Sequence, residues 1–154
     1  RVEGPVMVTP PWTLAPAALE SMRGDLRTVE HVAGASLELT WGAEVCHQSQ
    51  TIHSPRLAFI GASKETRFPG EALRDGGVVI HQHPGRVAAE PSDRDCEAAL
   101  RLGLPSCGFA VANYDLTRLV IMKAPQPVTP PRSRAWCRSF GWGRFYGLIG
   151  WSGK

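Results

Sequence analysis

Two histidines and an aspartate near the middle of the chain have the types and spacing of a metal site. The segment GVVIHQHPGRVAAEPSDRD (77–95) places His81 and His83 at the end of an apolar run, and Asp95 follows twelve residues later. Residues i and i+2 of a strand project to the same face, so the two imidazoles would lie side by side and could bind one cation. Asp95 would add an oxygen ligand. Three protein ligands with an open fourth position are typical of a catalytic zinc, which activates a water molecule.

The same residues also have a simpler interpretation. Ser92 and Asp95 form an S-x-x-D pattern before a short apolar helix, which is an ordinary helix-capping pattern, and histidines at strand ends are common. The two interpretations are compatible, because Ser92 can cap the helix while its first turn directs Asp95 toward a metal.

The apolar pattern predicts the elements that position these residues. In chain order, it predicts a helix over 13–25, one or two strands over 28–42, their continuation over 44–52, a buried strand over 56–63, a strand over 77–84, a short helix over 92–103 and a β-hairpin over 106–125. This order favours an α+β fold around a mixed, mainly antiparallel sheet flanked by helices. The Pro-rich stretch at 124–131 divides a domain over 1–125 from a linker and tail over 126–154.

The motif resembles a known family. His81-Gln82-His83-Pro84, followed by Ser92 and Asp95, is similar to the H-x-H-P…S-x-x-D signature of the JAB/MPN (JAMM) metalloproteases. The segment EPSDRD resembles the RadC-type bacterial branch, and the hairpin looks like the strand pair that follows the metal helix in prokaryotic members. The resemblance covers about residues 13–125. The loop between the second histidine and Asp95 is one residue longer than the commonest family spacing, so Asp93 is an alternative ligand.

The resemblance implies a JAB/MPN, cytidine-deaminase-like architecture and a bound Zn²⁺. The implied zinc ligands are His81, His83 and Asp95. The implied activity is hydrolysis of peptide or isopeptide bonds, including the removal or processing of ubiquitin-like modifiers, with a ubiquitin-like or peptide tail as the substrate.

The family pattern also includes a glutamate on an early strand after the first helix, which holds the attacking water and transfers its proton. Glu30 is the best match, with Glu38 and Glu44 as alternatives. Its pKa should be tuned toward neutrality for this work. Ser92 would donate a hydrogen bond to the developing oxyanion.

Composition predicts a soluble, cytoplasmic protein. The 154 residues are 43% hydrophobic and 20% charged, and no apolar run approaches the roughly 18–20 residues that a membrane span needs. The four cysteines are widely scattered without a CxxC pair, which fits a reducing compartment.

The C-terminal part is basic and aromatic. From Arg118 onward there are seven basic residues and no acidic one, whereas the preceding chain has ten basic and fourteen acidic residues. Such a tail could bind a protein partner or nucleic acid, although its aromatic residues are more simply explained by packing on the domain. If the tail does bind, the alternative function is a non-catalytic MPN-like scaffold or a RadC-type nucleic-acid-associated module.

Overall fold

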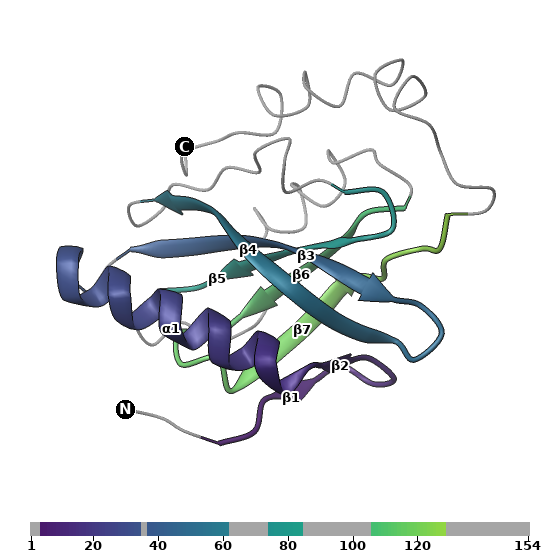
Figure 1. Cartoon of the computed structure of the whole chain (residues 1–154), viewed down its shortest axis with the longest axis horizontal. Helices are drawn as coiled ribbons and strands as arrows, with labels where there is room; N and C mark the ends of the chain where they lie inside the picture. The colour runs from purple at the N-terminus through teal and green to yellow at the C-terminus, as the bar shows by residue number, and fades with distance from the viewer. Residues whose placement is uncertain (1–3, 35–36, 62–73, 85–105, 129–154) are drawn as a thin grey trace, which may run out of the picture.

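The protein folds into a seven-stranded mixed sheet with one long helix against one face (Figure 1). The computed structural model describes residues 4–34, 37–61, 74–84 and 106–128, and every structural statement concerns these residues. The elements are β1 (Met7–Val8), β2 (Thr13–Leu14), α1 (Pro16–Ala33), β3 (Glu38–Cys46), β4 (Thr51–Gly61), β5 (Val78–Gln82), β6 (Gly108–Ala112) and β7 (Arg118–Lys123).

Helix α1 is eight residues longer at its C-terminal end than the sequence pattern predicted. Pro16 occupies the first turn, where its missing N–H costs nothing. One stripe of the helix is buried, and it consists of Ala18, Met22, Leu26 and Val29. Because Val29 continues this stripe, tertiary packing overrides the strand preference of the β-branched residues around it. The helix ends at Gly34, whose φ of 86° suits glycine. The prediction of a strand beginning at residue 28 was therefore wrong.

The strands lie in the order β1-β7-β6-β5-β3-β4-β2. Three neighbouring pairs are parallel (β1–β7, β2–β4 and β5–β6) and three are antiparallel (β3–β4, β3–β5 and β6–β7). The two edge strands are joined by the short segment 9–12, so the sheet is nearly closed. A mixed sheet with helix was predicted correctly, but only one helix flanks the sheet in the described part, and the predicted helix at 92–103 lies outside it.

The two faces of the sheet have different chemistry. Leu39 and Trp41 of β3, and Val78 and Ile80 of β5, belong to the apolar core that includes the buried stripe of α1. The Trp41 indole N–H donates to a carboxylate oxygen of Asp25 on the helix at 2.9 Å. Side chains alternate between the faces of a strand, so the residues between these core positions project to the opposite face. That face holds the candidate site.

The connection from β5 to β6 begins at the histidines. These strands are parallel neighbours, so the chain leaves the C-terminal end of β5 and must return to the N-terminal end of β6. The predicted Ser92 and Asp95 belong to this crossover and lie outside the described residues. The predicted hairpin is confirmed as β6 and β7, and the Asn113 side chain accepts hydrogen bonds from the backbone N–H groups of Thr117 and Arg118. The described part contains no helix long and apolar enough to cross a membrane.

Candidate metal centre

His81 and His83 lie side by side at the C-terminal end of the central strand, as their spacing predicted. Their ring centroids are 5.3 Å apart, with an angle of 73° between the ring planes. Strand pairing continues through His83, whose backbone N–H donates to the Ala112 carbonyl at 2.8 Å. The two side chains are only 2% and 5% exposed. Burying two imidazoles is unfavourable unless they have polar partners, so this pair is not an ordinary solvated strand end.

The separation of the two rings fits a shared zinc ion. A ring nitrogen about 2.05 Å from zinc places the ring centre roughly 3.2 Å from the metal, so two rings at a tetrahedral angle have centres about 5.2 Å apart. The observed separation is 5.3 Å. This spacing is compatible with two ligands of one zinc ion, and it is also an ordinary separation for an edge-to-face ring contact.

Glu38 is the carboxylate beside this pair. One of its carboxylate oxygens lies 3.7 Å from Nε2 of His81, and the side chain is buried. Thr40, two residues along the same strand, lies directly opposite His81, and its hydroxyl is 3.5 Å from Nδ1 of that histidine. Because β3 and β5 are neighbours, they bring an oxygen donor and two nitrogen donors to the same face.

Glu30, the first choice for the general base from sequence, does not belong to this cluster. It lies on α1 rather than on a strand, and its carboxylate accepts a hydrogen bond from the Tyr114 hydroxyl. Helix α1 packs on the face opposite His81, so the sheet separates Glu30 from the two histidines. The expected strand position of Glu30 was wrong because α1 continues through it. Of the two alternatives, Glu44 is exposed near the other end of β3, whereas Glu38 lies beside His81.

Gln82 is a buried polar residue behind the site whose role the motif did not indicate. It lies between the two histidines, so its side chain points to the face covered by α1. Its carbonyl oxygen accepts from the Leu39 backbone N–H at 3.3 Å, and its amide nitrogen donates to the Tyr114 carbonyl at 2.8 Å. Gln82 thereby connects the backbone next to Glu38 with the turn between β6 and β7. A polar residue inside a buried apolar strand was the sequence signal that could have revealed it.

The remaining predicted residues are not placed. Ser92, Asp95 and its alternative Asp93 lie outside the described residues, as does most of the tail over 126–154. Within the described ranges, no three histidine, cysteine, aspartate or glutamate side chains form a group that could hold a metal ion. A zinc site at this pair would need a further ligand from elsewhere in the chain, and Asp95 is the residue predicted for that role.

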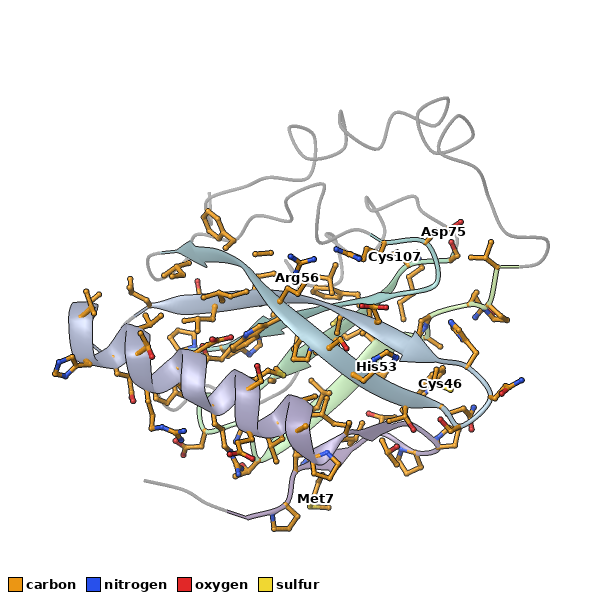
Figure 2. All side chains as sticks on the ribbon, viewed as in Figure 1. Met7, Cys46, His53, Arg56, Asp75 and Cys107 are labelled. Atoms are coloured by element: carbon orange, nitrogen blue, oxygen red, sulfur yellow. The ribbon has the colours of Figure 1, made fainter. Side chains whose placement is uncertain are left out.

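The other described histidines and cysteines lie away from this cluster. Figure 2 shows His53 and Cys46 toward the turn that joins β3 and β4, and Cys107 at the start of β6. Both cysteines are free thiols. Hydrogen bonds from Ser49, chiefly from its side chain, lower the pKa of Cys46, whereas burial raises the pKa of Cys107 to about 12. His47 contacts the Gly76 carbonyl through Nε2 at 2.8 Å, so it has a structural partner.

Comparison with known proteins gives no relative for this chain: no protein-family model, curated protein or solved structure matches it.

Proposed function

We propose that the protein is a zinc-dependent hydrolase of peptide or isopeptide bonds of the JAB/MPN type, with Glu38 as its general base. The observation that supports this most strongly is the buried group of His81, His83 and Glu38 at one end of the central strands. Buried ionisable side chains that lie close together at a strand end are typical of functional sites. The sequence resemblance supplies Asp95 as the third ligand and Ser92 as the oxyanion donor.

Each residue has a distinct task in this proposal. His81 and His83 would hold the ion through ring nitrogens, with Asp95 as the oxygen ligand. A bound zinc ion would polarise the scissile carbonyl and make water acidic enough to attack at neutral pH. Glu38 accepts the proton of the attacking water and delivers it to the leaving amine, which completes amide hydrolysis without further groups. Thr40 lies 3.5 Å from Nδ1 of His81, where its hydroxyl can fix the orientation of the ring.

The substrate is assigned only by chemical class. By resemblance, a ubiquitin-like or peptide tail with an amide bond to a lysine or to a following residue is the proposed substrate. The alternative, a scaffold or a nucleic-acid-binding module, depends on the basic aromatic tail, which lies largely outside the described residues.

The test compares two glutamates of the same chain. Zinc-loaded Glu38→Gln should retain the metal and lose at least about 100-fold in the rate of hydrolysis of ubiquitin-like fusions. Glu30→Gln is the matched control: it makes the same chemical change on the other side of the sheet and should keep near wild-type activity. Equal activity in wild type and Glu38→Gln, or selective loss in Glu30→Gln, would contradict the assignment.

A further inference from the structure

We infer that Gln82 is a positioning residue that holds Glu38 at the distance from His81 that the reaction requires. Gln82 lies at the end of the β3–β5 ladder, where the backbone pairing stops. The last backbone pair is Thr40 with His81. Continued in the same register, Leu39 would face Gln82, and Glu38 would face His83.

Where the backbone pairing of β3 and β5 ends, the Gln82 side chain supplies the next hydrogen-bond acceptor for β3. The Leu39 N–H bonds to the Gln82 side-chain oxygen, while β5 continues toward β6 through the His83 N–H. Beyond Thr40 and His81, β3 is therefore not paired with β5 through the backbone, and the two strands can diverge next to Glu38. The Gln82 side-chain oxygen holds the β3 backbone at Leu39. The orientation of the amide is fixed by chemistry, since a backbone N–H needs an oxygen acceptor and a carbonyl needs an N–H donor.

The attachment continues to the helix. The Gln82 amide nitrogen donates to the Tyr114 carbonyl, and the Tyr114 hydroxyl donates to the Glu30 carboxylate on α1. The Gln82 side chain is completely buried, and its hydrogen bond from the Leu39 N–H is shielded from water. Tyr114 binds Gln82 through its backbone carbonyl and Glu30 through its hydroxyl, so the contact with Glu30 can be removed while both Gln82 hydrogen bonds remain.

The placement can be tested without catalysis, in the metal-free protein. In wild type, nuclear Overhauser contacts should connect the Gln82 side-chain amide with the Leu39 backbone N–H, and their absence would overturn the inference.

Gln82→Met keeps the side-chain volume and removes the hydrogen-bond acceptor, so hydrogen exchange of the Leu39 amide should accelerate about tenfold relative to the Ile80 amide. Tyr114→Phe is the matched control, because it removes a bond of the same network but leaves the Gln82 contacts; Leu39 exchange relative to Ile80 should stay within about twofold of wild type. Equal Leu39 exchange in both variants would overturn the inference.

The catalytic consequence rests on the proposed function and has its own readout. Zinc-loaded Gln82→Met should keep one zinc per chain and a KM within about threefold of wild type, while kcat falls about 10- to 100-fold. Because the effect acts through Glu38, adding Gln82→Met to Glu38→Gln should lower kcat no further. Independent losses that multiply in the double variant would refute a positioning role. Wild-type protein without hydrolytic activity but with the predicted Leu39 exchange would reject the proposed function and leave the placement of Glu38 by Gln82 intact.

Discussion

The buried thiol of Cys107 should make the protein less stable in alkali. Its side chain has no exposed surface, and this burial raises its pKa from 9.0 to about 12. The folded state therefore keeps the thiol proton at pH values where the unfolded chain releases it. Stability from this group is fully present below pH 9, and it is lost progressively as pH rises from 9 toward 12.

The magnitude at pH 10 follows from the two pKa values. Ionisation of the unfolded thiol one pH unit above its pKa lowers the free energy of unfolding by about 1.4 kcal/mol, and the folded thiol is still protonated at that pH. Lys123 acts in the opposite direction in this range. Burial lowers its pKa, so the cost of holding its charge in the folded state disappears as pH rises. The Cys107 contribution must therefore be measured as a difference between variants.

The assay is urea unfolding followed by tryptophan fluorescence, in reducing buffer, at pH 7 and pH 10. The loss of stability between the two pH values should be about 1.4 kcal/mol smaller in Cys107→Ala than in wild type. Cys46→Ala is the control. The pKa of Cys46 is lowered in the folded state, so its contribution to stability grows with pH, and removing it should change the pH dependence in the opposite direction. An unchanged pH dependence in Cys107→Ala would refute the reasoning.

Two further predictions concern glycine packing and thiol reactivity. Gly108→Ala should destabilise the fold by about 1–3 kcal/mol in thermal or urea unfolding, because an added Cβ would lie 2.7 Å from the backbone nitrogen of Pro125. Gly24→Ala, where the nearest side-chain atom is 3.9 Å away within α1, should instead stabilise by about 0.5–1 kcal/mol, and destabilisation of equal size in both variants would contradict the packing argument. In native protein at pH 8, iodoacetamide should modify Cys46 well before Cys107, because the pKa of Cys46 is lowered and Cys107 is a buried thiol. Peptide mass mapping after timed quenching measures both sites, and faster labelling of Cys107 would be inconsistent with its burial.

Some features of the fold could be predicted because their signal is local. The apolar run before His81 predicted a buried strand, and the β-rich runs on either side of Asn113 predicted the hairpin. The edge strands β1 and β2 have only two residues each, so they show no periodicity that a sequence analysis could detect. The predicted strand over 44–52 spans the turn between β3 and β4, and the predicted strand over 56–63 covers only the later part of the 11-residue strand β4, in which Pro55 interrupts the sequence pattern.

The parts of the candidate site that depend on sequence spacing could be predicted, whereas those that depend on the arrangement of the strands could not. The i, i+2 rule placed His81 and His83 on one face without knowledge of the fold. To choose between Glu30 and Glu38 as the general base, one must know where α1 ends and which strand lies next to β5. Both depend on long-range packing. Leu39 and Trp41 on the core face do place Glu38 on the other face, but only once β3 is known to begin at residue 38. Gln82 was missed because its partners are backbone groups distant in sequence.

The central claim is that His81 and His83 bind zinc, and zinc stoichiometry tests it most directly. Protein stripped with a chelator should be incubated with excess zinc, desalted and measured by elemental analysis, with His83→Ala and His53→Ala alongside wild type. His53 is the matched control, because it contacts Ser54 on β4 away from the cluster. The account predicts close to one zinc per chain in wild type and His53→Ala, and none in His83→Ala. Wild-type protein that retains no zinc, or His83→Ala protein that retains a full equivalent, would contradict it.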